Sequence, residues 1–300
     1  EYDTAFFDKR SKFLHYLPEL VVVNNIEFDH ADIFKDLDEI KLSFRRLLNV
    51  VPTEGMVLIN GDDQNCIDVS QNCQAPIVEV GFSENAANRI LHPWQKDGSC
   101  GFELFGEKFE LPMIGEHNLS NAAMAVSAAH FYGVPTKTIR EALLKFEGIK
   151  RRQEVRGVVS GITIIDDFGH HPTAIRQTLE GLSQRYAGSR IWALFEPRSN
   201  TTRRAVFQHD LPPAFAASHG VVIGAVNRAA DLKPEDRLDA DLLVADLIKS
   251  GKSAFQEPSA DKIVEMLRPQ LQKGDVIVVL SNGAFDGLHE KLLLGLQNLA

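Results

Sequence analysis

The spacing of apolar and polar residues predicts two differently built halves of the chain. In the first half, short apolar runs predict β-strands at 19–26, 56–60, 76–82 and 102–111, the last folded into a hairpin at Gly106-Glu107. Apolar residues at helical spacing predict helices at 35–49, Leu119–Tyr132 and 136–146. The second of these helices is rich in alanine, and Gly133 and Pro135 are expected to end it.

From about residue 150 onward, predicted strands and helices alternate. The strands are expected near 160–166, 190–195, 220–226 and 275–280. The helices are expected near 173–186, 201–208, 241–249, 260–271 and 285–298. Such alternation is typical of a parallel, doubly wound α/β sheet. We therefore expect two domains, residues 1–149 and 150–300, with a boundary near 148–152.

Composition and charge narrow the classes of partner. The chain has a mass of 33.3 kDa, with 44% hydrophobic and 24% charged residues, as in an ordinary globular protein. Its net charge of −9 implies no general surface for nucleic acid. No apolar run approaches the roughly 18 residues of a membrane span, and the charged first residues do not resemble a signal peptide. We expect neither nucleic acid nor a membrane as partner.

Cysteine usage and the first residues add two expectations. The three cysteines, Cys66, Cys73 and Cys100, show no CxxC spacing, and an odd number argues against a disulfide framework. A reducing cytoplasm fits this pattern. The chain has no initiator Met, and its first residues read as the middle of a domain, so we expect it to be part of a longer protein.

The segment Asp166-Asp167-Phe168-Gly169-His170-His171-Pro172 is the richest in candidate chemistry. It follows a β-rich run and ends in a proline where a helix begins, which is a favoured position for proline. Polar groups at the carboxyl end of a strand and beside a helix amino terminus are where α/β proteins bind ligands. The plainer alternative is a strand-to-helix turn whose aspartates cap the helix.

Two motifs of the first half also follow predicted strands or open helices. His30, in Asn24-Asn25-Ile26-Glu27-Phe28-Asp29-His30, is a candidate metal ligand or else a capping or core histidine. Three polar residues within the first turn of the alanine-rich helix either cap it or read an adenine edge: His117, Asn118 and Asn121.

Three further motifs belong to the second half. Arg151-Arg152 stands at the expected domain boundary, where an arginine can stabilise phosphate charge, although such doublets are usually solvated surface features. The segments 196–201 (EPRSNT) and 280–287 (LSNGAFDG) follow strands and belong at the same sheet edge as Asp167 and His171. Their Arg, Asn and Ser residues suit a substrate rich in carboxylates and amides, but turns favour the same residues.

Together these motifs resemble the Mur ligases, the ATP-dependent amide-forming enzymes of peptidoglycan assembly. NxExDH, GxHNxxNxxAA, the Arg-Arg junction and DDxxHHP occur in that family's order, and the resemblance covers essentially all 300 residues. It implies an incomplete central ATPase-type α/β domain over 1–149. A doubly wound, Rossmann-like carboxyl-terminal domain over 150–300 would then serve the substrate peptide and the nucleotide ribose.

The resemblance also implies a reaction and its participants. EPRSNT and LSNGAFDG are most like the branch that joins UDP-N-acetylmuramate to the murein tripeptide L-Ala-γ-D-Glu-meso-diaminopimelate in peptidoglycan recycling, through an acyl phosphate, with ATP and Mg²⁺. DDxGHHP is shared with the branch that adds L-alanine, which stays the alternative. Such chemistry needs positioning and charge neutralisation more than a side-chain nucleophile. A cytoplasmic enzyme is implied.

The implied roles fall on residues at the motifs. Glu1 and His30 would hold Mg²⁺, with His30 and Arg152 as catalytic residues. ATP would be bound by His117, Asn118, Asn121, Arg152 and Asp167. The tripeptide would meet His170, His171, Arg198, Ser199, Asn200, Ser281 and Asn282.

The chain departs from the family pattern in two ways. The phosphate loop GxxGKT/S and the domain for the UDP-sugar are absent and are expected before Glu1, since Glu1-Tyr2-Asp3 resembles the end of the family's EADEYD segment. We therefore expect this chain alone to be inactive. Phe44 occupies the place of a carbamylated lysine known in several relatives, with Lys41 one turn earlier, so that role is not assigned.

Two other classes of function stay open. One is a transition-metal hydrolase built on Asp166, Asp167, His170 and His171, although the candidates at the other strand ends are mainly Asn, Ser and Arg. The other is a nucleotide-binding regulatory module without catalysis.

Overall fold

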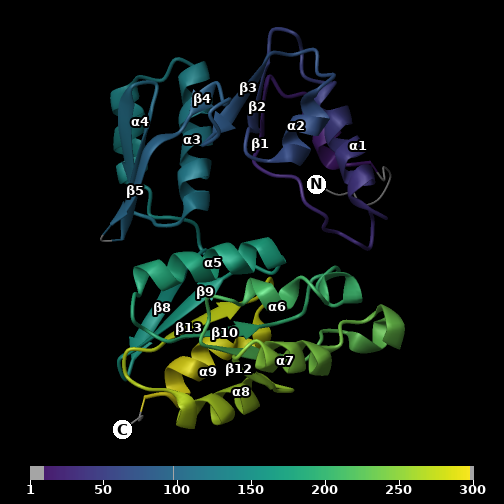
Figure 1. Ribbon diagram of the computed structural model, residues 1–300, viewed down its shortest axis with the longest axis vertical. Helices are drawn as coiled ribbons and strands as arrows, with labels where there is room; N and C mark the ends of the chain where they lie inside the picture. The colour runs from purple at the N-terminus through teal and green to yellow at the C-terminus, as the bar shows by residue number, and fades with distance from the viewer. Residues whose placement is uncertain (1–9, 97, 298–300) are drawn as a thin grey trace. The chain divides into compact units, whose positions relative to one another are not determined.

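A computed structural model describes residues 10–96 and 98–297 of the chain. The chain divides into two compact units, Glu1–Glu147 and Gly148–Ala300. The first unit has two β-sheets and the second has one, with helices packed against them (Figure 1).

A parallel four-stranded sheet forms the centre of the first unit. Its strands follow chain order: β1 (Leu20–Val23), β2 (Met56–Asn60), β3 (Ile77–Gly81) and β4 (Asn88–Arg89). The helices α1 (Leu37–Leu48) and α2 (Gln64–Ser70) pack on one face, where Val23 and Ile59 belong to their hydrophobic core. A short 3-10 helix, η1 (Lys12–His15), precedes β1.

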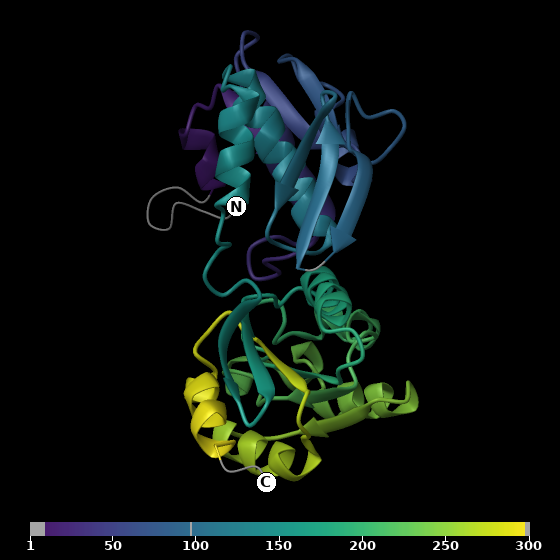
Figure 2. The same cartoon turned by 90° about the vertical axis from the view of Figure 1, so that its left-hand side faces the viewer.

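The other face of this sheet is covered by α3 (Glu116–Phe131). An antiparallel sheet of β5 (Leu91–Lys96), β6 (Ser99–Leu104) and β7 (Glu107–Leu111) packs beyond α3, so that this helix contacts both sheets. Figure 2 shows the three strands and α3 together. Ala and Leu on several sides of α3 are buried, as an alanine-rich sequence allows. The helix α4 (Thr136–Leu144) packs against β7.

A six-stranded sheet in the order β12-β11-β10-β13-β9-β8 forms the second unit. Its strands are β8 (Glu154–Val159), β9 (Ile162–Asp167), β10 (Ile191–Phe195), β11 (Gly220–Ile223), β12 (Ser253–Gln256) and β13 (Val276–Leu280). All pairs are parallel except β8 with β9. Every residue of β10, β11 and β13 is buried, because helices cover both faces.

The helices divide between the two faces of this sheet. On one face lie α5 (Pro172–Arg185), α6 (Leu211–Ala214) and α7 (Ala240–Lys249), and on the other α8 (Ala260–Leu267) and α9 (Leu288–Gly295). Successive strand residues alternate between the two cores, as the period of two requires. The predicted α/β class and the doubly wound sheet are confirmed.

The structure corrects the helix expected at 201–208. That stretch holds turns and the 3-10 helix η2 (Ala205–Phe207), because the Ser199 and Thr202 hydroxyls bond backbone N–H groups of this turn instead. The helix expected over 285–298 is also shorter. Phe285, Asp286 and Gly287 have positive φ in the 3-10 turn η6 (Phe285–Gly287), and α9 follows it.

Other boundaries also differ from the sequence prediction. The helix α3 begins at Glu116 rather than Leu119, and β1 ends at Val23. Five helices and strands lacked a clear pattern and were not predicted, α2, α6, β4, β5 and β12, and β8 was covered only by the β-rich run before Asp166. Short 3-10 turns η3 (Ala229–Asp231), η4 (Pro234–Asp236) and η5 (Arg268–Gln270) complete the second unit. Among the described residues, no helix is long and apolar enough to cross a membrane.

Candidate functional site

Three loops of the second unit meet at the carboxyl edge of its sheet. Strand β13 lies between β9 and β10, so the loops that follow these strands are neighbours. The Ser281 N–H donates to the Asp167 carbonyl (3.1 Å), and the Glu196 N–H donates to the Leu280 carbonyl (3.1 Å). The motifs around Asp167, Glu196 and Ser281 are therefore brought together, at the edge where doubly wound sheets bind ligands.

Asp167 faces inward and positions the loop that follows β9. Its side chain is 2% exposed, and its two oxygens accept the N–H groups of Gly169 (2.6 Å) and Gln153 (2.9 Å). Burial raises the pKa of this carboxyl, and the two N–H donors partly offset that effect. In this conformation the carboxylate orders the loop, so the ribose contact expected of Asp167 stays a prediction.

Asp166 is also buried, between Arg151 and His289. The Arg151 Nε lies 3.3 Å from Asp166 Oδ2, and His289 Nε2 lies 3.2 Å from Oδ1. Burial opposes ionisation of Asp166, but His289 and Arg151 outweigh it and hold the pKa below its ordinary value. The two aspartates thus carry structural contacts, and the described residues contain no group of three or more His, Cys, Asp or Glu that could hold a metal ion.

The two histidines of the same loop have different surroundings. The His170 Nδ1 lies 3.0 Å from the Phe168 carbonyl oxygen. His171 is the N-cap of α5, where its Nδ1 accepts the Thr173 N–H (3.3 Å), and its ring packs edge-on against Phe207. The cap of this helix is therefore a histidine rather than an aspartate. Both rings remain partly exposed at the sheet edge.

Arg198 is the exposed cation among the predicted substrate residues at this edge. Its Nη1 lies 3.4 Å from Oε1 of Glu196, a buried carboxylate directly after β10. The Ser281 hydroxyl donates to the other Glu196 oxygen (2.5 Å) and accepts the Gly283 N–H (2.9 Å). Ser281 is fully buried, so it contacts the site through Glu196 and does not face solvent.

The remaining polar residues of these two loops differ in what they offer. Ser199 and Thr202 exchange hydrogen bonds within their own turn, with 2.8 Å between the two hydroxyls. Asn200 is exposed at the surface. Within the part of the chain that is described, the buried Oδ1 of Asn282 has no hydrogen-bond partner, which leaves an acceptor at the edge.

The two residues of the arginine doublet, Arg151 and Arg152, differ in their exposure to solvent. Both guanidinium carbons lie close to the Phe168 ring, at 5.2 Å for Arg151 and 5.4 Å for Arg152 from its centroid. Arg151 is half-buried, whereas Arg152 is exposed. The exposed member is the one that the sequence predicts for phosphate.

The motif that ends in His30 forms a turn in the first unit. His30 has a φ of 54°, its N–H donates to Asp29 Oδ1 (2.7 Å), and its carbonyl accepts the N–H groups of Ile33 and Phe34. Glu1, its expected partner in holding Mg²⁺, lies outside the described residues. No group of three or more possible metal ligands includes His30 among the described residues, so its role in holding Mg²⁺ stays a prediction.

The three polar residues at the start of α3 also have distinct surroundings. The Asn118 side chain is buried, and its Nδ2 donates to the Ile114 carbonyl (2.7 Å). The His117 ring lies over Gly115, so closely that a Cβ at this position would overlap the ring. Gly115 also has a φ of 109°, which favours glycine. Asn121 is exposed. His117 is partly exposed and Asn118 is buried, so the adenine contacts expected of these three residues stay a prediction.

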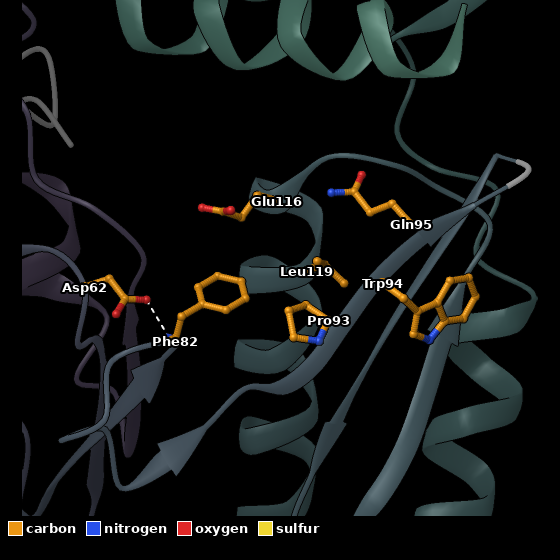
Figure 3. A pocket seen from close by; sticks show the side chains of 7 residues that line it. All are labelled: Asp62, Phe82, Pro93, Trp94, Gln95, Glu116 and Leu119. Carbon is orange, nitrogen blue, oxygen red and sulfur yellow. Dashed lines mark hydrogen bonds between the residues drawn. The ribbon is translucent and has the colours of Figure 1, made fainter. Parts of the chain in front are cut away.

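A cavity of about 580 Å³ opens on another side of α3. Figure 3 shows its lining of Asp62, Phe82, Pro93, Trp94, Gln95, Glu116 and Leu119. The Asp62 carboxylate accepts the N–H groups of Phe82 and Ser83, and Gln95 accepts the Gly115 N–H. The three predicted adenine residues do not line this cavity.

Arg151 and Glu196 were predicted only as members of their motifs, without roles of their own, and His289 was not predicted. Glu196 could have been found as a charged residue that directly follows an entirely apolar strand. His289 gave no such signal, because its approach to Asp166 depends on how α9 packs.

Two family models match the chain. The Mur ligase middle domain matches residues 5–129, and the Mur ligase glutamate ligase domain matches residues 151–283.

Individual relatives share both parts of the chain. A UDP-N-acetylmuramate–L-alanyl-γ-D-glutamyl-meso-2,6-diaminoheptandioate ligase of Haemophilus influenzae is 39% identical over 98% of this chain and 63% of its own length. A UDP-N-acetylmuramate–L-alanine ligase of Caldanaerobacter subterraneus subsp. tengcongensis is 32% identical over 94% of this chain and 62% of its own length. The crystal structure of a murein peptide ligase from Psychrobacter arcticus covers all of this chain, with a TM-score of 0.72 and 32% identity; the chain covers 62% of it. The chain thus spans less than two thirds of each relative.

Proposed function

Because this chain belongs to the Mur ligase family, we propose that it carries two domains of an ATP-dependent ligase that joins UDP-N-acetylmuramate to L-Ala-γ-D-Glu-meso-diaminopimelate. The observation that supports this substrate most is the 39% identity over 98% of the chain to a relative that bears that name. The relative named for L-alanine is 32% identical over 94% of the chain. Peptidoglycan recycling in the cytoplasm is part of the same proposal.

The proposed reaction has two steps. The carboxylate of UDP-N-acetylmuramate attacks the γ-phosphorus of ATP, so that an acyl phosphate forms and ADP leaves. The free amine of the tripeptide then attacks the acyl carbon, the carbon–nitrogen bond forms, and phosphate leaves with the bonding electrons as the amine loses a proton. Neither step needs a side-chain nucleophile, so the protein contributes mainly orientation and charge neutralisation.

On the nucleotide side, we assign the exposed Arg152 to the phosphates of ATP. Its guanidinium rests against Phe168 and so has a restricted position. His117, Asn118 and Asn121 are assigned to the adenine and Asp167 to the ribose. If Mg²⁺ is bound by His30 and Glu1, it would neutralise phosphate charge.

On the peptide side, the tripeptide offers several carboxylates to the carboxyl edge of the second unit. Arg198 is exposed there and can bind a carboxylate with two parallel hydrogen bonds. Asn282 and Asn200 offer amide groups, Ser199 a hydroxyl, and His170 and His171 partly exposed rings. Ser281 acts from below through Glu196.

We also propose that the 300-residue chain does not turn over ATP by itself, because GxxGKT/S does not occur in it. A Gly-Lys-Ser triplet exists at Gly251–Ser253, but it joins a helix to a strand instead of a strand to a helix. The Lys252 ammonium donates to the carbonyls of Ala216 and Ser218, so it holds a turn rather than a phosphate.

Arg198→Ala in the full-length protein tests the substrate assignment. Removing a charged partner of a bound carboxylate costs about 2–5 kcal/mol, so kcat/KM for the tripeptide should fall far more than kcat/KM for ATP or the UDP-sugar. Steady-state ADP release with each substrate varied in turn measures this. Arg185→Ala, an exposed arginine of α5, is the matched control and should change none of the three values.

Two results would replace the proposal. If the unmutated protein turns over L-alanine better than the tripeptide, it is an alanine-adding ligase, the branch with which it shares DDxGHHP. If it releases no ADP with either acceptor while it still binds ATP, the nucleotide-binding module is the better description.

A further inference from the structure

Arg151 makes more contacts at the carboxyl edge than a solvated boundary residue would. Its Nη2 donates to two carbonyls of the loop after β13, those of Ser281 (2.6 Å) and Gly283 (2.7 Å). Its Nε faces Asp166 at 3.3 Å. One guanidinium therefore joins the segment before β8 to the end of β9 and to the loop after β13.

The loop that Arg151 holds is the surface on which Arg198 lies. A Cβ added at Gly283 would come within 2.6 Å of the Arg198 Cζ, so the Arg198 side chain passes directly over this glycine. The same loop supplies Ser281, whose hydroxyl bonds Glu196, and Glu196 in turn faces Arg198. Contacts thus run without a break from Arg151 through 281–283 to Arg198.

The position of Arg151 is itself fixed from two sides. Asp166, which it faces, has His289 Nε2 at 3.2 Å from its other oxygen, and both residues are buried. The Arg151 N–H donates to Glu154 Oε2 (2.8 Å), and its guanidinium packs on Phe168. A buried carboxylate can orient a guanidinium more firmly than a solvated one, because the local dielectric constant is lower.

We propose that Arg151 is a positioning residue: it fixes the loop 281–283 so that Arg198 and Asn282 are held ready for the carboxylates of the incoming peptide. This inference rests on the proposed function, since it assumes a peptide acceptor at this edge. Arg151 does not touch the substrate; it acts through Ser281 and Gly283. Its neighbour Arg152 serves the phosphates, so the two members of the doublet have separate roles.

A lysine cannot replace these contacts. The planar guanidinium places one nitrogen between two carbonyls while another faces Asp166, whereas an ammonium is a single point charge on a flexible stem. Arg151 has a φ of 59°, a conformation that glycine adopts without strain. Arg151→Gly therefore removes the side chain, leaves a space of guanidinium shape and keeps the backbone conformation.

The test compares Arg151→Lys, Arg151→Gly, Arg152→Ala and the control Arg156→Ala in the full-length protein. Both Arg151 variants should raise KM for the tripeptide about ten- to a hundredfold, because the loss of a charged hydrogen bond weakens binding by about that factor. KM for ATP should change much less. Arg152→Ala should show the reverse pattern. Arg156, whose side chain faces Glu154 and Glu290 at the surface, should leave both unchanged.

Chemical rescue provides a readout that a merely structural role would not move. Millimolar guanidinium chloride should restore tripeptide use in Arg151→Gly by filling the vacated space, whereas sodium chloride at equal concentration should not. Hydrogen exchange at the amides of 281–283 should speed up in the glycine variant and slow again with guanidinium.

The outcomes separate the inference from the function. Equal losses for tripeptide and ATP, no loss, or no rescue would overturn the role of Arg151 while the ligase assignment stands. If the unmutated protein does not use the tripeptide at all, the proposed function falls and the inference falls with it.

Discussion

At the scale of single residues, the pKa values of two neighbouring carboxyl groups are shifted in opposite directions. Burial raises the pKa of Asp167 above its ordinary 3.8. Its contribution to the free energy of unfolding is therefore full below pH 3.8 and is lost as the pH rises through the pKa of the folded state. Asp166 is buried too, but His289 and Arg151 lower its pKa, so its contribution is present above 3.8 and lost as the pH falls. Both carboxyl groups make contacts with the loops of the candidate site, so a change in their protonation should affect the conformation of these loops.

Gly283→Ala is the residue-scale prediction. An added Cβ would overlap the Arg198 side chain, which is flexible at its far end and can move away at little cost. The free energy of unfolding should therefore change by less than about 1 kcal/mol, whereas kcat/KM for the tripeptide should fall about tenfold or more. Urea unfolding and steady-state kinetics measure the two quantities.

The double variant Gly283→Ala/Arg198→Ala decides whether the loss runs through Arg198. Once Arg198 is removed, the methyl group has nothing to displace, so the second change should add little to the first. Additive losses would mean that Gly283 is needed for another reason, such as a direct approach of the substrate to the backbone.

The residue types at this edge could be predicted from the sequence, but their contacts could not. Asp167 lies at the end of a largely apolar strand, and Arg198 and Asn282 lie in the loops that follow two others, so a parallel sheet predicts that they share one edge. Whether a carboxylate faces the ligand or the backbone depends on donors far along the chain, such as the Gln153 N–H for Asp167. No local pattern reveals such a donor.

At the scale of elements, an ion pair fixes the opposite edge of the same sheet. Arg190, just before β10, makes two hydrogen bonds to Asp275, just before β13, at 2.9 and 2.6 Å. Asp275 is 1% exposed and also accepts the Gln272 N–H (2.8 Å). The pair sets where two central strands begin, at the end away from the candidate site.

Asp275→Ala should destabilise the second unit without changing catalysis. Breaking a buried pair leaves Arg190 and the Gln272 N–H without their partner, at a cost of about 3 kcal/mol. Kinetic constants measured well below the unfolding temperature should be unchanged. Asp246→Ala, which removes a surface pair with Lys249 on α7, is the control and should cost less than about 0.5 kcal/mol. A fall in kcat with intact stability would place Asp275 in the catalytic machinery.

The elements that the sequence predicted well are those with strong patterns. The apolar runs of β10 and β13 and the helical spacing of α1 correspond to elements of the structure. The helix expected at 201–208 was wrong because serine and threonine hydroxyls compete for the backbone, as noted above for Ser199 and Thr202. Strand β5 (LHPWQK) was missed because a proline and exposed residues hide its alternation.

At the scale of the whole molecule, the hydrophobic cores respect the division into two units. Two clusters of buried side chains lie in the first unit, around Ile59 and Phe102, and two in the second, around Phe195 and Ile277. Among the described residues, none of these clusters takes members from both units. A separate core is the physical condition for a domain that folds by itself.

We therefore predict that the chain unfolds in two transitions, one for each unit. Ile59→Ala empties a fully buried position of β2 and should destabilise the first unit by about 2–5 kcal/mol, while Asp275→Ala should destabilise the second. Hydrogen exchange followed by peptide mass analysis across a urea series assigns each transition, because peptides of 10–147 and of 148–297 report separately. Each variant should shift the midpoint for its own peptides and leave the other set in place. If either variant shifts both sets together, the two units unfold as one cooperative body, and contacts that join them, rather than separate cores, would govern the stability of the whole chain.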